Sequence, residues 1–212
     1  MDILTHEMMY RGRKTVEQRS KTAILVCGAG ALGSRLLDLL ACQGYAPSIV
    51  DFDKVERHNL GNQHFSPSDI GKMKATQAAN NVFRRLGTKV TAIDKKVTAE
   101  NVSKIIRGQH LVVDVFDNAE SRQLIVDACR ESDIAAIHGG MGSSFAEVEW
   151  NENYHPHAVP VDANAPCEYP LAVNLVLFTV SILAEVINGY VDRKEKRSIH
   201  FTLKDMHIDR VD

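Results

Sequence analysis

Three glycines with the spacing Gly-x-Gly-x-x-Gly follow a short apolar run at residues 24–27. Four apolar residues are too few for a helix, so the pattern predicts a buried strand that turns sharply into a helix. Gly28 would allow the tight turn, Gly30 would let backbone N–H groups approach a phosphate, and Gly33 would let the helix pack against the strand. The positive end of that helix would face an anion, and the stretch therefore predicts a phosphate-binding loop.

Carboxylates follow two further apolar runs. Asp51 directly follows residues 48–50 and lies about 20 residues after the glycine loop. A carboxylate at this place can accept hydrogen bonds from ribose hydroxyls. Residues 111–113 end in Asp114, and Asp117 and Asn118 follow before a helix predicted at 119–131. Ligands of an open α/β sheet lie beyond the carboxyl ends of its strands, so we expect these groups to converge. Carboxylates beside a triphosphate favour a bridging Mg²⁺, and a capping role for Asp117 and Asn118 is compatible with that function.

The glycine fingerprint alone does not distinguish ATP from a dinucleotide redox cofactor, and the residues after Asp51 are more informative. The loop at residues 53–71 is too long for a simple connection, and such loops usually carry function. Lys72 and Lys74 then begin an amphipathic helix predicted at residues 71–86, where the helix dipole disfavours a cation. Bound phosphate would favour Lys74 at this position, and a solvated lysine is the alternative.

The complete set of motifs resembles the ThiF/MoeB/HesA family, adenylyltransferases related to the ubiquitin-activating enzymes, over roughly residues 9–190. The family pattern is GxGxxG, then DxDxVxxxNLxRQ, then Gly-x-x-Lys, then a strand ending Asp-x-x-Asp-Asn with an arginine soon after. After the glycine loop, this sequence has Asp51, Asp53, Val55, Asn59, Leu60, Gln63, Gly71, Lys74, Asp114, Asp117, Asn118 and Arg122. We expect an α/β fold, with a Rossmann-like, mostly parallel sheet, helices on both faces and a mixed or antiparallel C-terminal edge.

The resemblance also implies the residues of the site. Asp117 would hold Mg²⁺, and ATP would be contacted by Gly28, Gly30, Ala31, Gly33, Asp51, Asp53, Asn59, Asn62, Gln63, Lys74 and Asn118. Asn62 stands where the family has an arginine that contacts the triphosphate. An amide cannot replace a positive charge, so either Arg57, Lys72 or an N-terminal arginine compensates, or turnover is weak.

The N-terminal basic segment, residues 1–20, contains Arg11 and Arg13. In the family, a short basic segment supplies an arginine that reaches the triphosphate, often across a dimer interface. A guanidinium can stabilise charge on a reacting phosphate. Because this arginine would come from a second copy of the chain, we expect a homodimer. A solvated N-terminal helix is the alternative interpretation.

Residues 151–170 are expected to form a crossover loop before an apolar helix at 171–188, which we assign to the core or to a dimer face. Relatives place in this region a cysteine that accepts the activated acyl group as a thioester, and Cys167 is the candidate. His155, His157 and Cys167 form an alternative metal-binding set with irregular spacing. The four cysteines include no CxxC pair, so we expect neither a disulfide framework nor the structural zinc of many family members.

Length and charge limit the possible classes. A chain of 212 residues suits one domain, residues 1–212, large enough to bury its own core. Its net charge of -2 gives no electrostatic reason to expect a nucleic acid or an anionic membrane as a partner. No apolar run approaches the ~20 residues that span a bilayer, and the N-terminus has no signal-peptide core, so we expect a cytoplasmic protein.

The predicted function is ATP-dependent adenylylation of the C-terminal carboxylate of a ubiquitin-like or sulfur-carrier protein. A strand is expected at residues 134–137, closed by a glycine-rich turn at 138–142, and a final strand or hairpin is expected at residues 198–211. The small residues at 139–144 would let that partner's flexible C-terminal tail pass close to the nucleotide. A non-catalytic member that binds nucleotide or a partner is one alternative, because Asn62 replaces the arginine and the chain is short. An NAD(P)-dependent oxidoreductase is a second alternative, favoured only by the glycine loop and Asp51.

Overall fold

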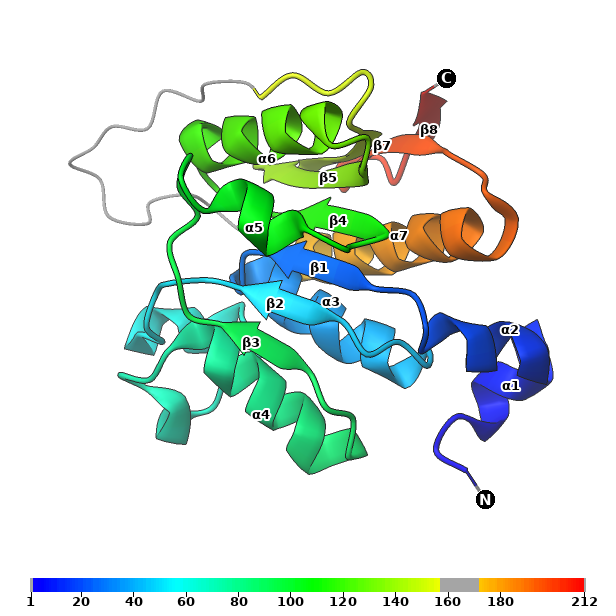
Figure 1. Cartoon of the computed structure of the whole chain (residues 1–212), viewed down its shortest axis with the longest axis horizontal. Helices are drawn as coiled ribbons and strands as arrows, with labels where there is room; N and C mark the ends of the chain where they lie inside the picture. The colour runs from blue at the N-terminus through cyan, green and yellow to red at the C-terminus, as the bar shows by residue number, and fades with distance from the viewer. Residues whose placement is uncertain (1, 157–171, 212) are drawn as a thin grey trace.

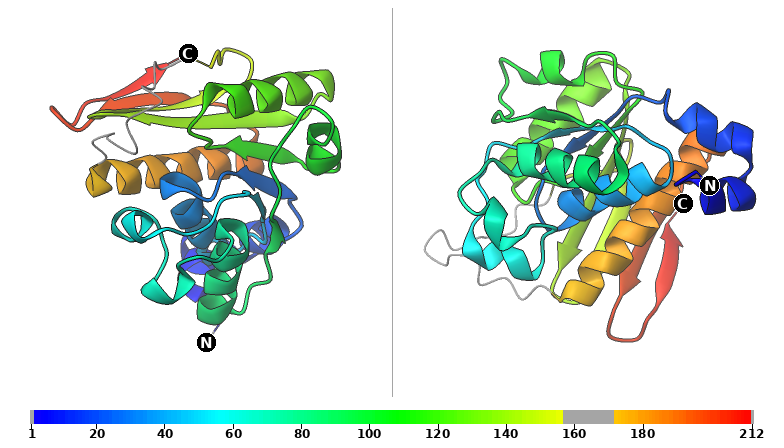
Figure 2. Two further views of the ribbon diagram at one scale, coloured as in Figure 1. Left: turned by 90° about the vertical axis from the view of Figure 1, so that its left-hand side faces the viewer. Right: turned by 90° about the horizontal axis from the view of Figure 1, so that it is seen from below.

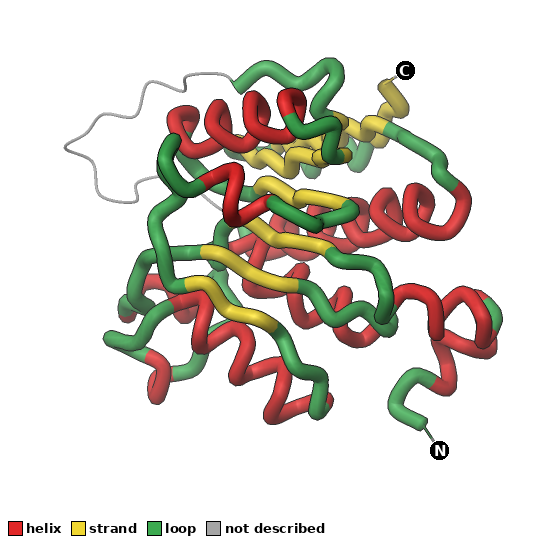
Figure 3. The backbone as a smooth tube through the Cα atoms, in the orientation of Figure 1, coloured by secondary structure: helices red, strands yellow, loops and turns green. Residues whose placement is uncertain are grey.

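The computed structural model describes residues 2–156 and 172–211, which build one mixed sheet surrounded by helices (Figures 1 and 3). Its eight strands lie in the order β3-β2-β1-β4-β5-β6-β7-β8. They are β1 (Ile24–Cys27), β2 (Ser48–Val50), β3 (Thr91–Ile93), β4 (Leu111–Asp114), β5 (Ala135–Gly142), β6 (Phe145–Trp150), β7 (Ser198–Thr202) and β8 (Ile208–Val211). The expected α/β fold is confirmed.

The first five strands are parallel, and β6, β7 and β8 continue the sheet in antiparallel order. The chain runs from β1 outward to β2 and β3 and then returns to the other side of β1 as β4. The direction in which the strands are added therefore reverses between β1 and β4, and ligands of such sheets usually bind in the crevice at the carboxyl ends of these two strands. Every residue of β1 and β4 is buried, as expected for parallel strands covered on both faces.

Helices cover both faces of the sheet (Figure 2). On one face, α3 (Ala31–Cys42), α4 (Lys74–Leu86) and α7 (Val173–Arg193) contribute to one apolar cluster with the strands. On the other face, α5 (Val102–Ile106) and α6 (Ala119–Glu131) contribute to a second cluster. The strands are thus fixed from both sides, and the loops at their carboxyl ends are positioned by a rigid scaffold.

Helix α7 is the one described helix whose length and hydropathy would suit a membrane span. Of the 18-residue window that meets this criterion, 56% is buried inside the fold. The buried side chains pack in the cluster that α3 and the sheet also form. This corrects the expectation that no apolar segment approaches the length of a membrane span. Core helices of soluble proteins have the same character, and the burial of α7 fits the core, one of the two places that the sequence suggested for this helix.

Strand β5 is longer than the sequence indicated. We expected the strand to end at Ile137, before a closing glycine-rich turn, but β5 continues to Gly142 and pairs with β6 in a hairpin. A Cβ atom at Gly139 would lie 3.2 Å from side-chain atoms of both Leu183 and Val115. The missing side chain therefore lets α7 pack closely, and the stretch at 139–142 is strand rather than a turn.

Two helices precede the sheet, α1 (Thr5–Arg11) and α2 (Arg13–Arg19). They are anchored by Arg19, whose fully buried guanidinium lies 3.0 Å from the Glu7 carboxylate and 2.6 Å from that of Asp192 on α7. The same guanidinium lies over the ring of Tyr45. Because α2 leads directly into β1, this pair of helices lies at the amino edge of the sheet, away from the crevice (Figure 1).

Candidate functional site

The glycine loop turns from β1 into α3 at the crevice. Gly28 has a φ of +103°, which side-chain-bearing residues rarely adopt, and its N–H donates to the Val50 carbonyl at 2.9 Å. A Cβ atom at position 33 would lie 1.8 Å from the Gly28 carbonyl oxygen, so only glycine lets α3 approach the loop this closely. Gly30 is the N-cap of α3, Ala31 is its first residue, and a Cβ at Gly30 would meet no atom within 4 Å. The N-terminus of α3 therefore has open space beside it.

Asp51 braces this loop. One carboxylate oxygen accepts a hydrogen bond from the Ala29 N–H at 2.7 Å, and the other accepts from the Asp53 N–H at 2.7 Å. Burial raises the pKa of Asp51 above its usual range, and the two backbone hydrogen bonds act against that increase. Each oxygen keeps a second lone pair, so the carboxylate fixes the loop and can still accept from ribose hydroxyls.

Lys74 is the first residue of α4 and is almost fully buried. Its Nζ lies 3.1 Å from Oδ2 of Asp53, whose side chain is 48% exposed. The backbone N–H of Lys74 also donates to the Asp53 carbonyl at 2.8 Å. Asp53 thus compensates a cation that the helix dipole disfavours, and the lysine is held at the carboxyl edge of β2.

The loop after Asp53 contains two short 3-10 helices, η1 (Arg57–Gly61) and η2 (Pro67–Asp69). Asn59 is buried, and its Oδ1 accepts from the Glu56 N–H at 2.8 Å while its carbonyl accepts from Gln63 at 2.9 Å. The hydrogen bonds of Asn59 in this structure therefore stabilise the conformation of the loop. Asn62 Oδ1 and Gln63 Oε1 are buried without a hydrogen-bond partner among the described residues. Buried acceptors of this kind normally have a partner, so a ligand or water donor fits at this point.

The turn after β4 lies against the glycine loop, because a Cβ at Gly28 would be 3.1 Å from the Val115 carbonyl oxygen. Asp117 is exposed in this turn, and its Oδ1 accepts from the Asn118 side chain at 3.3 Å. Asn118 Oδ1 accepts from the Ser121 N–H at 2.9 Å, which confirms the predicted cap of α6. An exposed carboxylate beside the crevice is a suitable oxygen ligand for Mg²⁺.

A buried polar cluster behind this turn was not foreseen from the sequence. His138 stacks on Tyr154, with ring centroids 4.0 Å apart, and its two ring nitrogens each lie 2.8 Å from an oxygen, Asp114 Oδ2 and Asn151 Oδ1. Asp114 and His138 are directly paired in the register of β4 and β5. A histidine within an apolar strand, level with an aspartate at the end of the next strand, is the signal that could have identified this pair.

Arg122 connects the cluster to the crevice. Its guanidinium donates to the Phe116 carbonyl at 2.6 Å, the Gly139 carbonyl at 2.7 Å and the Tyr154 hydroxyl at 2.6 Å. These contacts join the turn after β4, strand β5 and the chain that leads toward the crossover segment. The arginine in the motif therefore has a positioning role in this structure.

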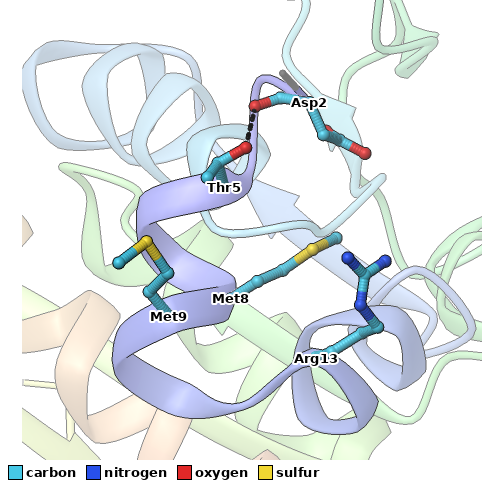
Figure 4. A pocket seen from close by; sticks show the side chains of 5 residues that line it. All are labelled: Asp2, Thr5, Met8, Met9 and Arg13. Carbon is cyan, nitrogen blue, oxygen red and sulfur yellow. Dashed lines mark hydrogen bonds between the residues drawn. The ribbon is translucent and has the colours of Figure 1, made fainter.

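The two N-terminal arginines do not lie at the crevice of their own chain. Arg11 pairs with Glu7 and with Glu185 on α7, at 2.7 and 2.6 Å. Arg13 is largely exposed and lines a shallow hollow with Asp2, Thr5, Met8 and Met9 (Figure 4). Both residues sit at the amino edge of the sheet, so either could reach a triphosphate only in another copy of the chain.

Among the described cysteines, Cys27 and Cys129 are buried and Cys42 is half-buried. Burial raises the pKa of the Cys129 thiol to about 12 and that of Cys27 well above its usual range, as expected for inert core thiols. Cys167 and His157 lie outside the described residues. Among those described, Glu147, Glu149 and His200 form a group that could hold a metal ion, but His200 already pairs with Glu149 at 2.6 Å.

Comparison with known proteins gives consistent similarities. The profile of the ThiF family matches residues 5–164. The SAMP-activating enzyme E1 of Haloferax volcanii is 37% identical over 122 residues, covering 56% of this chain and 45% of that protein. The sulfur carrier protein ThiS adenylyltransferase of Bacillus subtilis is 33% identical over 126 residues, covering 57% of this chain and 38% of that protein. The chain thus spans less than half the length of these curated relatives.

One solved structure is also similar to this chain. E. coli tRNA N6-threonylcarbamoyladenosine dehydratase in complex with ATP superposes with a TM-score of 0.64 at 25% identity, covering 68% of this chain and 63% of that one.

Proposed function

The chain belongs to the ThiF family, whose profile matches residues 5–164, and on that premise we propose that it is an ATP-dependent adenylyltransferase. Its substrate would be the C-terminal carboxylate of a ubiquitin-like or sulfur-carrier protein, which it would activate as an acyl-adenylate. Two relatives support this substrate class, because one is named as a SAMP-activating enzyme and the other as a sulfur carrier protein adenylyltransferase.

The proposal depends chiefly on the arrangement at the carboxyl edge of β1, β2 and β4. A glycine loop braced by Asp51 opens the N-terminus of α3 to an anion, and the buried Lys74 supplies a positive charge from α4. Asp117 supplies an exposed carboxylate from the turn after β4. The helix terminus and the lysine would bind phosphate groups, and the carboxylate would bind Mg²⁺. This combination suits a nucleoside triphosphate better than a nicotinamide cofactor.

The reaction would need little acid or base chemistry. An oxygen of the partner's carboxylate would attack the α-phosphorus of ATP, and the bond from that phosphorus to the oxygen bridging the β-phosphate would break. Pyrophosphate would leave with that bonding electron pair. Mg²⁺ would neutralise charge on the phosphates, and Asp117 would hold it. The residues of this chain would mainly position ATP and compensate its charge, and on binding Lys74 would exchange Asp53 for a phosphate oxygen.

A homodimer is part of the proposal, because Arg11 and Arg13 lie at the amino edge and would serve only a neighbouring copy. Sedimentation velocity of the purified protein, with and without Mg-ATP, tests it. A monomer at micromolar concentration in both conditions would exclude an arginine from a second copy.

The function itself is tested by calorimetric titration with Mg-ATP and, separately, with NAD⁺ and NADP⁺. We expect ATP to bind and the dinucleotides not to bind; binding of a dinucleotide alone would refute the proposal. ATP–pyrophosphate exchange with candidate carrier proteins ending in Gly-Gly then tests turnover. Nucleotide binding without exchange for any carrier would favour the non-catalytic alternative, which Asn62 makes the second candidate.

A further inference from the structure

Arg35 is a half-buried cation beside the glycine loop whose charge no described residue compensates. It lies on α3, four residues after Ala31, and its Nε donates to the Asn62 carbonyl at 3.0 Å. Among the described residues no carboxylate lies within ion-pair distance of it. The nearby Asp38 pairs instead with Arg85 at 2.5 Å. A partly desolvated guanidinium without an anion is unfavourable, so this position favours binding of a negative group.

The direction of the side chain is consistent with a ligand at the loop. Side chains of a helix tilt toward its N-terminus, so Arg35 extends over the first turn of α3, the turn that Gly30 and Ala31 begin. One of its five N–H donors contacts Asn62, and no residue in the described ranges accepts from the other four. The Asn62 carbonyl therefore aims the guanidinium without neutralising it.

The neighbouring segment is fixed against the same turn. The His64 N–H donates to the Ser34 hydroxyl at 3.0 Å, and that hydroxyl donates to the Gly30 carbonyl at 2.6 Å. The two unpartnered buried acceptors, Asn62 Oδ1 and Gln63 Oε1, lie in this segment. A ligand with a phosphate group could bind the Arg35 guanidinium, and its hydroxyl or amino groups could donate to the two amide oxygens. A nucleotide has groups of both kinds.

We propose that Arg35 binds the phosphates of the nucleotide and thereby supplies the positive charge that Asn62 lacks. The role rests on the proposed function. It assigns the compensating charge to α3 of the same chain, rather than to Arg57, Lys72 or an N-terminal arginine. Compared with the family pattern, the positive charge lies on α3 instead of in the loop. The loop residue, Asn62, accepts the hydrogen bond that orients the guanidinium.

The test compares the affinities of the variants for Mg-ATP and for adenosine by calorimetry. Arg35→Ala should weaken Mg-ATP binding by about tenfold to a hundredfold, as expected for lost charge-assisted hydrogen bonds, and leave adenosine affinity unchanged. Arg107→Ala removes the same charge at an exposed position at the end of α5 and should change neither affinity. In the double variant Arg35→Ala/Asn62→Arg, Mg-ATP affinity should recover, because the charge returns to the loop.

Each other outcome has a separate meaning. If the unaltered protein does not bind Mg-ATP, both the proposed function and this role are wrong. If it binds Mg-ATP but Arg35→Ala binds equally well, or Arg57→Ala alone shows the loss, the function stands and the assignment to Arg35 is wrong. If Arg35→Ala weakens adenosine as much as Mg-ATP, the arginine only supports the loop and the phosphate role is refuted.

Discussion

Two glycines of the same loop should differ in how replacement by alanine changes the stability of the fold. At Gly33 the new Cβ would lie 1.8 Å from the Gly28 carbonyl oxygen. Raising that separation to the 3.0 Å minimum of real Cβ contacts requires a shift of at least 1.2 Å, and the obstacle is backbone rather than a flexible side chain. Overpacking of this kind costs about 3 kcal/mol, and the higher helix propensity of alanine returns up to about 1 kcal/mol. We expect Gly33→Ala to lose about 2 kcal/mol of stability, equivalent to about 4–8 °C in Tm.

Gly30→Ala is the matched control. Its Cβ would meet no atom within 4 Å, so the free energy of unfolding should stay within about 0.5 kcal/mol of the unaltered protein. The added methyl group would occupy the open space where a phosphate is proposed to approach, so Mg-ATP affinity should fall although the fold is intact. Gly33→Ala should weaken both properties.

Urea unfolding followed by tryptophan fluorescence measures the stability difference, because the single tryptophan, Trp150, is 3% exposed in the core. An unfolding midpoint of Gly33→Ala equal to that of the unaltered protein would refute the packing role of Gly33. Unchanged Mg-ATP affinity of Gly30→Ala in calorimetry would refute close phosphate approach at Gly30.

Asp117→Ala should abolish ATP–pyrophosphate exchange with the circular dichroism spectrum unchanged, since the carboxylate is exposed; retained exchange would remove Asp117 from the mechanism. Arg19→Ala should cost about 3–5 kcal/mol of unfolding free energy, because it leaves two carboxylates without their buried partner. The exposed Arg13→Ala should cost at most about 1 kcal/mol, and equal urea midpoints for the two variants would contradict the anchoring role of Arg19. Burial raises the pKa of the Cys129 thiol to about 12, so that thiol stays protonated until the pH approaches this value. A disulfide reagent at pH 8 should therefore modify neither Cys129 nor Cys27 in the native protein. Labelling of either residue found by mass spectrometry would show that the core opens.

Local patterns in the sequence predicted those parts of the fold that neighbouring residues determine. The helix expected at residues 119–131 matches α6. Of the strand or hairpin expected at residues 198–211, the structure shows the hairpin, β7 and β8. Strand β5 was predicted too short because its glycines look like a turn when seen in isolation. Their place in a strand depends on pairing with β6 and on packing against α7, which no local pattern contains.

The site shows the same division between local and distant determinants. Gly33 and the cap at Asn118 follow from spacing, and the structure agrees with both interpretations. The partners of Arg11 and Lys74 do not follow from spacing, since Glu185 lies 174 residues from Arg11 and Asp53 lies 21 residues from Lys74. Arg35 was missed because a single arginine on a helix has no distinctive pattern until its surroundings show that it lacks a carboxylate.

The anchor of the N-terminal helices also constrains the order in which the chain can complete its structure during synthesis. Arg19 and Asp192 are 173 residues apart in sequence, so the arginine leaves the ribosome long before its partner exists. At synthesis rates of about 5–20 residues per second, that interval is about 9–35 s. During this time Arg19 lacks its α7 counter-charge, and α1 and α2 cannot dock stably. Strands β1 to β6 and the glycine loop can therefore form first, and α1 and α2 dock only once α7 has been made.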